Sequence, residues 1–324
     1  MHSIWQAPMP AFPPQSQDIN TQVLIIGGGL AGVLCAWRLH QAGVDYALIE
    51  ENTIGSQTTG GTTAKITAQH GLIYDKWIRR FGIAKARLYL EANQRALAQY
   101  RALAQTIDCD FERQNAYVYA KTDRQCLRRE VNALRCLGFH AELVQPQGLP
   151  FPTVGAVCFS HQAQINPRKL LAGLAGGLHI YEHTKAQKLT GTQCITNRGR
   201  IRAQKVIVAT HFPLLNKRGG FCLKLYQQRS YVLALKNVDG PEGMYIDAEP
   251  GGLSLRRYQD YCLLGGAGLH DGSHDCGRHA FGYGTGKAQS LRVSAESFAQ
   301  HAKGAAMDQC RRGRQKSTNA HPAP

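Results

Sequence analysis

The chain lacks any run of 18 apolar residues, which excludes an ordinary transmembrane helix. Its first residues, MHSIWQAPMPAFPPQSQ, contain four prolines and no apolar core of signal-peptide length. We therefore expect a soluble, cytoplasmic protein with no membrane partner. Residues 1–18 are expected to form an extended N-terminal arm along the surface.

Closely spaced cysteine pairs are also absent. The ten cysteines are scattered along the chain without a CxxC pair, and several lie in apolar stretches. Cysteine in such a stretch behaves as a small hydrophobic residue, so we expect reduced thiols rather than a disulfide framework. We predict no metal site.

A long basic block is missing as well. Lys and Arg number 38 against 22 Asp and Glu, and the formal net charge is +16. The basic residues are nevertheless dispersed, and the chain contains no recognisable nucleic-acid module. We predict a solvated basic surface and no nucleic-acid partner.

Aliphatic side chains become scarce near the C-terminus. Residues 270–324 contain one leucine, one valine and no isoleucine. A segment of this composition cannot bury enough apolar surface to offset its conformational entropy. We predict that residues 269–324 form a disordered or aberrant tail.

The clearest motif that is present lies near the N-terminus. Residues 23–26 (VLII) predict a strand buried on both faces, which runs into the glycines Gly27, Gly29 and Gly32 and then into a helix. The first glycine permits a tight turn, the second lets the backbone approach a pyrophosphate, and the third lets the helix pack on the strand. Glu50 ends a second apolar strand eighteen residues after Gly32, where its carboxylate can accept hydrogen bonds from ribose hydroxyls. The unit predicts a dinucleotide site and by itself suits either FAD or NAD(P).

The order of the remaining segments predicts the fold. A Gly- and Thr-rich loop follows Glu50, a second buried parallel strand occupies residues 205–210, and antiparallel strands follow from 223 to 265. This order predicts an α/β fold, in which an FAD/NAD(P)-binding Rossmann-like domain is interleaved with an α+β substrate domain built on an antiparallel sheet. The predicted nucleotide domain spans 19–108 and 161–220, and the substrate domain spans 109–160 and 221–268.

These motifs resemble those of the FAD-dependent oxidoreductases of the D-amino-acid oxidase and glycine oxidase superfamily. Two further segments share the resemblance, QAQINPRKLLAGLA and RIRAQKVIVATHFP. The stretch TTAKITAQHGLIYDKWIRRFG is similar to the bacterial branch in which such a domain is often fused to a C-terminal Rieske iron–sulfur domain. The likeness covers about residues 19–268 and implies FAD as the cofactor. It assigns to FAD the residues Gly27, Gly29, Leu30, Ala31, Gly32, Glu50, Thr58, Thr59, Gly60, Thr62, Thr63, Ala64, Ala186, Ala209 and Thr210.

The chain departs from the family pattern in two places. His211 stands where relatives have a glycine after the strand that ends at Thr210. After Gly268 neither the returning glycine-rich segment of relatives nor the complete Rieske pattern of CxH and CxxH is found. We therefore expect a truncated or frame-shifted form of a longer enzyme.

The resemblance also implies a reaction. A hydride equivalent is expected to pass from a carbon next to nitrogen, in a small amine or amino acid, to the flavin N5 atom, with oxygen or an electron-acceptor protein as the final oxidant. Lys65 is the candidate cation beside the flavin N1 region, and Arg229 and Arg256 are candidates for a substrate carboxylate. Two alternatives stay open at this point: an NAD(P)-dependent reductase and a non-catalytic fragment.

Overall fold

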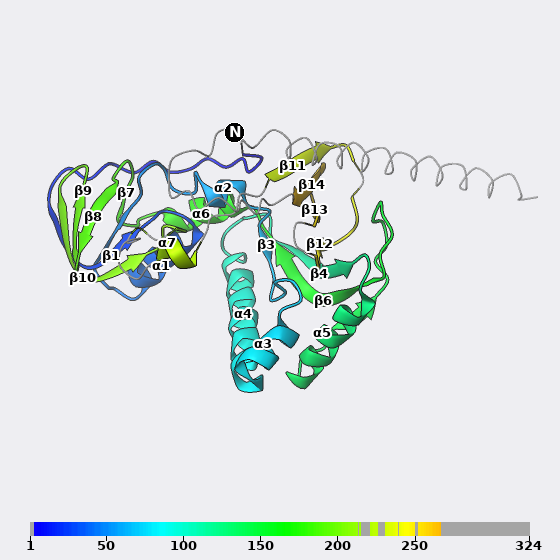
Figure 1. Cartoon of the computed structure of the whole chain (residues 1–324). Coiled ribbons are helices and arrows are strands. Elements are labelled where there is room, and N and C mark those ends of the chain that lie inside the picture. Colours follow the sequence, from blue (N-terminus) through cyan, green and yellow to red (C-terminus); the bar gives the residue numbers. More distant parts are fainter. Residues whose placement is uncertain are drawn as a thin grey trace, which may run out of the picture. The chain divides into compact units, whose positions relative to one another are not determined.

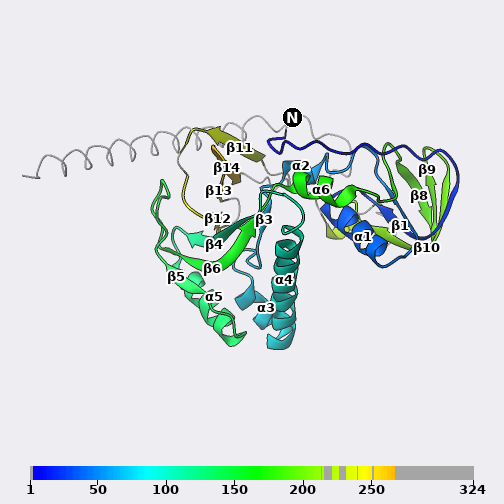
Figure 2. The same cartoon turned by 180° about the vertical axis from the view of Figure 1, so that it is seen from behind.

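The computed structural model of the chain describes residues 3–212, 214, 221–225, 231–238, 240–249 and 252–266. The chain divides into two compact units, whose elements are labelled in Figures 1 and 2. Unit 1 consists of Met1–Ala64, Ala98–Glu112 and Gln164–Gln227, and unit 2 of Lys65–Leu97, Arg113–Ala163 and Gln228–Pro324.

Unit 1 is built on a six-stranded sheet in the order β7-β2-β1-β10-β9-β8. Strand β1 lies parallel to β2 and to β10, so that Val23 has Tyr46 and Lys205 as its neighbours across the sheet. Strands β8, β9 and β10 form an antiparallel extension. The elements are β1 (Ile19–Ile26), α1 (Leu30–Gln41), β2 (Tyr46–Ile49), α2 (Thr58–Gly61), α6 (Pro167–Ala175), β7 (Ile180–Tyr181), β8 (Ala186–Thr190), β9 (Gln193–Thr196), β10 (Arg200–Val208) and α7 (Phe221–Lys224).

The apolar run of β1 explains the position of this sheet. Leu24 and Ile25 are fully buried although they point to opposite faces, which is expected of a central parallel strand covered on both sides. Leu24 belongs to a core cluster that also contains Ile49 of β2 and Ile201 of β10. Helix α1 packs against β2 and against α6.

Unit 2 is built on an eight-stranded sheet in the order β11-β14-β13-β12-β4-β6-β3, with β5 paired to β6. Strands β11 to β14 are antiparallel neighbours, whereas β12 runs parallel to β4. The elements are β3 (Lys65–Ile66), α3 (Tyr74–Phe81), β4 (Glu112–Ala120), α5 (Arg124–Cys136), β5 (Glu142–Val144), β6 (Gly155–Gln164), β11 (Tyr231–Lys236), β12 (Met244–Asp247), β13 (Ser254–Tyr258) and β14 (Tyr261–Gly266), with α4 (Ile83–Leu103) passing from unit 2 into unit 1.

Alternate residues of β4 serve the two faces of this second sheet. Ala116 and Ala120 join a core cluster with Leu90 of α4 and Leu134 of α5. Tyr119 joins a different cluster, together with Tyr245, Leu255 and Leu264 from the antiparallel strands. The period of two along β4 therefore gives the sheet one face covered by helices and a second apolar face.

A buried carboxylate joins two helices of unit 2. Glu130 of α5 is 1% exposed and accepts hydrogen bonds from the backbone N–H groups of Tyr74 (2.9 Å) and Asp75 (3.0 Å) at the start of α3. The N-cap residue of α3, Ile73, has no side-chain oxygen to satisfy these donors. Burial raises the pKa of Glu130, while the N–H donors oppose that rise.

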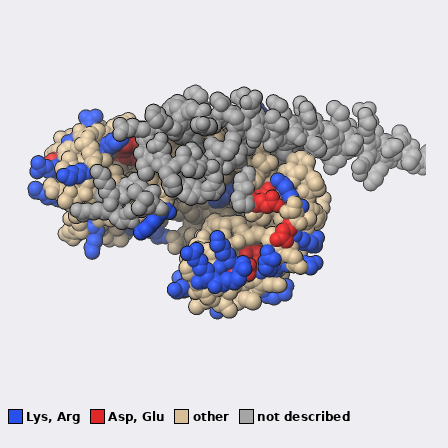
Figure 3. Space-filling view, in the orientation of Figure 1, with Lys and Arg blue, Asp and Glu red and all other residues tan. Residues whose placement is uncertain are grey.

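Basic side chains form a cluster on one face of the protein. On the face shown in Figure 3, Lys and Arg gather over the region of α3, α4 and α5. Arg79 of α3 pairs with Asp75 one turn earlier at 2.6 Å, but its side chain is 69% exposed, so the pair adds little stability. Within the described ranges, no helix has both the length and the hydrophobicity needed to cross a bilayer.

The predicted fold class is confirmed: a Rossmann-like α/β unit is interleaved with a unit that contains an antiparallel sheet. The compact units differ in extent from the predicted domains, because residues 65–97 belong to unit 2, where β3 joins the second sheet and α3 contacts α5. The predicted strand from residue 223 is wrong at its start, since 221–224 form the short helix α7. The predicted tail lies outside the described residues.

Candidate functional site

Backbone geometry requires two of the three motif glycines. Gly27 has φ +113°, and a Cβ atom there would lie 2.6 Å from the carbonyl oxygen of Ala209. A Cβ atom at Gly32 would lie 1.9 Å from the carbonyl oxygen of Gly27. A larger residue in place of Gly27 would push the turn away from the end of β10, and one in place of Gly32 would push α1 away from β1.

The start of α1 has the character of an anion site. The N-cap residue, Gly29, supplies no side-chain hydrogen bond, so the first N–H groups of the helix are not capped from within the motif. One of them, the N–H of Leu30, donates to Oγ1 of Thr59 at 3.2 Å. The helix dipole and the bare glycine backbone at this end suit a pyrophosphate, and Ala31 and Gly32 lie in the same turn of helix.

Glu50 holds the turn. Its carboxylate follows β2 and accepts hydrogen bonds from the N–H of Gly28 (2.7 Å) and of Asn52 (2.9 Å). A carboxylate offers about four acceptor positions on its two oxygens, so these two bonds leave capacity for ribose hydroxyls. Sequence reasoning predicted the ribose contact but missed this bond to Gly28.

The Gly- and Thr-rich segment lies beside the same turn. Thr58, Thr59 and Gly60 belong to the short helix α2, which corrects the expectation of a continuous loop. The Thr59 side chain is 9% exposed, and its hydroxyl oxygen would lie 3.3 Å from a Cβ atom on Gly29. Beyond α2, the Thr62 hydroxyl accepts a hydrogen bond from the N–H of Ala64 at 3.1 Å, which spans Thr63.

The ends of β8 and β10 complete unit 1 around the turn. Ala209 donates its N–H to the carbonyl oxygen of Ile26 at 2.8 Å, and the Thr210 hydroxyl donates to the carbonyl oxygen of Phe212 at 2.5 Å. Ala186 opens β8 and is buried in the core cluster that contains Ile26. His211 has φ +63°, a conformation that favours glycine and that matches the glycine of the family pattern.

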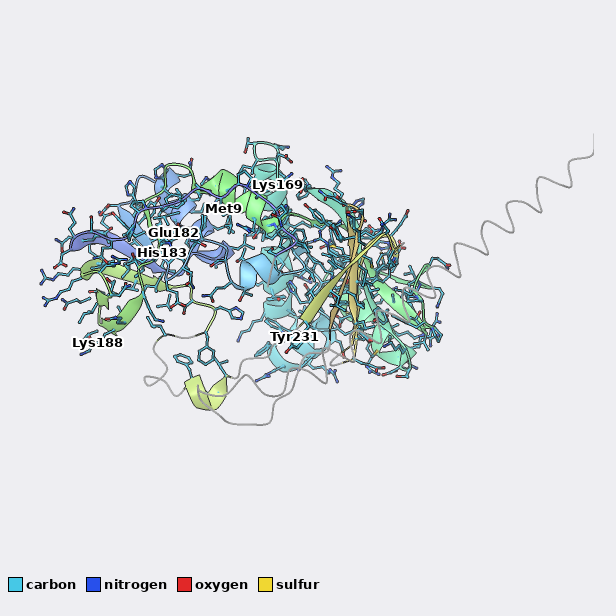
Figure 4. All side chains as sticks on the ribbon, turned by 90° about the horizontal axis from the view of Figure 1, so that it is seen from above. Met9, Lys169, Glu182, His183, Lys188 and Tyr231 are labelled. Atoms are coloured by element: carbon cyan, nitrogen blue, oxygen red, sulfur yellow. The ribbon has the colours of Figure 1, made fainter. Side chains whose placement is uncertain are left out.

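Sequence reasoning missed one buried acid of unit 1. Glu182 is 2% exposed and accepts hydrogen bonds from the N–H of Ile54 (2.7 Å) and of Phe12 (3.2 Å). Figure 4 labels it beside His183, with Met9 of the N-terminal arm nearby. No motif marks this residue, because its partners are backbone groups that come close only in the folded chain.

Two of the predicted catalytic residues, Lys65 and Arg256, lie in unit 2 and interact electrostatically. Lys65 of β3 donates a hydrogen bond from Nζ to Oγ of Ser254 on β13. These strands are four places apart in the sheet order, a separation of about 19 Å in a flat sheet, so the sheet must curve strongly. Arg256, two residues after Ser254, is fully buried. Arg229 lies outside the described residues.

The two cations influence each other. Burial lowers the pKa of Lys65 to about 7, and the positive charge of Arg256 contributes to that shift. An anion placed beside Arg256 would offset the repulsion and return the proton to Lys65.

A sheet whose central strands are parallel, a helix that begins behind a glycine turn and a carboxylate after β2 define a dinucleotide-binding α/β protein. The sequence profile of the family described as "DAO: FAD dependent oxidoreductase" matches residues 22–307, and the chain belongs to this family. The prediction of FAD as the cofactor is confirmed. The match continues past Gly268, where the motifs alone predicted that the likeness ends.

Two curated proteins are similar in sequence. The "Putative Rieske 2Fe-2S iron-sulfur protein YhfW" of Bacillus subtilis (strain 168) is 36% identical over 262 residues, covering 76% of this chain and 52% of the relative. The "Gamma-glutamylputrescine oxidoreductase" of Escherichia coli (strain K12) is 25% identical over 218 residues, covering 61% and 50%. The chain thus spans about half the length of these relatives.

Solved structures confirm the fold. Glycine oxidase from Geobacillus kaustophilus has a TM-score of 0.63 at 18% identity, with 88% of this chain and 80% of that chain covered. L-proline dehydrogenase from P. horikoshii has a TM-score of 0.64 at 18% identity, with 90% and 78% covered. At this identity the likeness concerns the fold alone.

Proposed function

We propose that the chain oxidises a small amine or amino acid and holds FAD in unit 1. Bound FAD supplies N5 as the acceptor of a hydride equivalent from the carbon next to nitrogen. The observation that carries this proposal is the turn from Gly27 to Gly32, where the N-cap residue Gly29 has no side chain and the Glu50 carboxylate lies beside the turn. The dinucleotide pyrophosphate is assigned to that helix start and the ribose to Glu50.

Unit 2 supplies the charge for the substrate. We assign Arg256 to the substrate carboxylate, because a planar guanidinium matches two carboxylate oxygens and because this arginine is fully buried. Lys65 is a second cation, whose lowered pKa lets it take up a proton when negative charge develops nearby. Ser254 holds the Lys65 ammonium by accepting its hydrogen bond. The assignment of Arg229 to the same task stays a prediction.

The relatives favour an amine or amino acid as the substrate class. The name of one curated relative, gamma-glutamylputrescine oxidoreductase, contains that of an amine. Two solved structures with a similar fold are those of a glycine oxidase and an L-proline dehydrogenase. An NAD(P)-dependent reductase is disfavoured by the family match, which names FAD.

The test is an absorbance spectrum of the purified chain, followed by anaerobic addition of amines and amino acids. We expect flavin bands after incubation with FAD, and bleaching of those bands by at least one of the added compounds. Arg256→Lys should raise KM for that compound about tenfold or more, because lysine cannot pair with both carboxylate oxygens. Arg257→Lys is the matched control, since Arg257 is the exposed neighbour on β13. A chain that takes up no flavin would contradict the proposal.

A further inference from the structure

The N-terminal arm, residues 3–18, contacts the segment assigned to the flavin. Ser3 donates its hydroxyl to the carbonyl oxygen of Gly60 at 2.6 Å. Trp5 donates its indole N–H to the carbonyl oxygen of Thr62 at 2.9 Å, and its side chain is 1% exposed. A tryptophan this deeply buried fixes the arm in place, because both its ring and its polar N–H are satisfied there.

The other end of the arm is anchored independently. Gln15 is 2% exposed, donates its N–H to the Thr184 hydroxyl at 3.0 Å, and accepts a hydrogen bond from the Thr196 hydroxyl at 2.8 Å. Asp18 accepts a hydrogen bond from the N–H of Arg200 at 2.8 Å, just before β1 begins. Hydrogen bonds therefore hold the arm against unit 1 at both of its ends.

Peptide geometry converts these contacts into an orientation. The carbonyl oxygen and the following N–H of a trans peptide point in opposite directions, and no cis peptide occurs among the described residues. Because the arm binds the carbonyl oxygens of Gly60 and Thr62, the peptide units that follow these two residues are each held in one orientation. The arm thereby fixes the last turn of α2 and the residue that follows it.

The same segment reaches the dinucleotide turn. The Thr59 hydroxyl accepts a hydrogen bond from the N–H of Leu30 at the start of α1. Thr59 directly precedes Gly60, whose carbonyl oxygen accepts the hydrogen bond from Ser3. A displacement of residues 60–62 would therefore move the Thr59 hydroxyl relative to that helix start. The arm, the segment and the turn form one connected set of contacts within unit 1.

We propose that Ser3 and Trp5 are positioning residues for FAD. By holding the carbonyl oxygens of Gly60 and Thr62, the arm fixes the Thr59 hydroxyl against the start of α1, so that the N–H groups assigned to the pyrophosphate are in place before the cofactor binds. This inference rests on the proposed function, which places FAD against residues 58–64. It gives the arm, which no nucleotide-binding motif includes, a part in cofactor binding.

The test compares Trp5→Phe with wild type, because phenylalanine keeps the ring packing and removes only the indole donor. The dissociation constant for FAD is measured from the quenching of flavin fluorescence, and amide hydrogen exchange of residues 60–64 is measured without FAD. We expect Trp5→Phe to weaken FAD binding about tenfold, to speed exchange in that segment, and to change the visible circular dichroism of the flavin at saturation. Ser3→Ala should act in the same direction, and Trp37→Phe on α1 is the matched control.

The outcomes separate the inference from the proposed function. Trp5→Phe and Ser3→Ala with wild-type FAD affinity and a wild-type flavin dichroism would overturn the inference and leave FAD binding in unit 1 intact. Faster exchange without any change in FAD affinity would also overturn it, because the segment would then move without consequence for the cofactor. A wild-type chain that binds no FAD would overturn both.

Discussion

At the scale of single residues, each of the three motif glycines has a different structural role. Gly27 needs its positive φ, Gly32 needs the space, and Gly29 leaves the first turn of α1 without a side chain. The chemistry of these positions is local, so a sequence pattern alone predicts it. Glu50 adds a contact that the pattern does not contain, the hydrogen bond to the N–H of Gly28.

Gly32→Ala should destabilise the chain by roughly 1–3 kcal/mol, because the new methyl group would overlap the carbonyl oxygen of Gly27 and force α1 away from β1. The free energy of unfolding in urea measures this loss. Gly176→Ala is the control, since no atom lies within 4 Å of a Cβ atom there. Equal stability of the two variants would mean that α1 does not pack on β1 at Gly32.

Lys65 should make stability depend on pH. Its pKa is lowered from 10.5 to about 7 in the folded chain, so between pH 7 and 10.5 the unfolded chain binds more protons than the folded one. The stability of wild type relative to Lys65→Met should therefore rise with pH across this window. The rise is at most about 5 kcal/mol, since one pKa unit corresponds to about 1.4 kcal/mol. A difference that stays flat from pH 6 to pH 10 would show that Lys65 is solvated.

At the scale of elements, helix ends follow local rules. Asp123 caps the helix that follows it: its carboxylate accepts hydrogen bonds from the N–H groups of Gln125 (2.7 Å) and Cys126 (3.2 Å) at the start of α5. Asn166 caps α6 in the same way, ahead of Pro167. These caps were predictable because donor and acceptor lie two or three residues apart.

Asp123→Ala should cost about 1 kcal/mol of stability, because two N–H groups of α5 lose their acceptor. Asp123→Asn should retain most of it, since asparagine caps nearly as well. Both variants also lose the negative charge that pairs with Arg129 at 3.5 Å. This ion pair is exposed to solvent and therefore contributes little to stability. Urea unfolding curves distinguish the cap from the charge: comparable losses in both variants would assign the effect to the ion pair.

Other elements could not be predicted from the sequence. The bond between Lys65 and Ser254 joins residues 189 apart and depends on the curvature of the second sheet. The contact of Trp5 with Thr62 spans 57 residues and depends on the path of the arm. Residues 58–61 were expected to be a loop but form α2, since a single helical turn carries too little periodic pattern to be recognised.

At the scale of the whole molecule, the sequence predicted two interleaved parts, and the compact units of the structure differ from the predicted domains in extent. Residues 65–97 follow the Gly- and Thr-rich segment directly, which favours one continuous domain. The structure assigns them to unit 2, because β3 belongs to the second sheet and α3 contacts α5. Chain order therefore predicted the architecture, whereas pairing between distant strands decided which unit each segment joined.

Cofactor binding should stabilise the chain. A ligand that binds only the folded state at 100 times its dissociation constant adds about 2.7 kcal/mol. FAD at that excess should therefore raise the melting temperature by several degrees, and NAD+ at the same concentration should not, because the family match names FAD. A shift caused by NAD+ alone would favour the reductase alternative.

The most direct test of the central claim is an experimental structure of the chain with FAD bound. We predict that the pyrophosphate accepts hydrogen bonds from the backbone between Gly29 and Gly32, and that a ribose hydroxyl donates to Glu50. A flavin bound elsewhere, or a Glu50 carboxylate turned away from any sugar, would contradict the account.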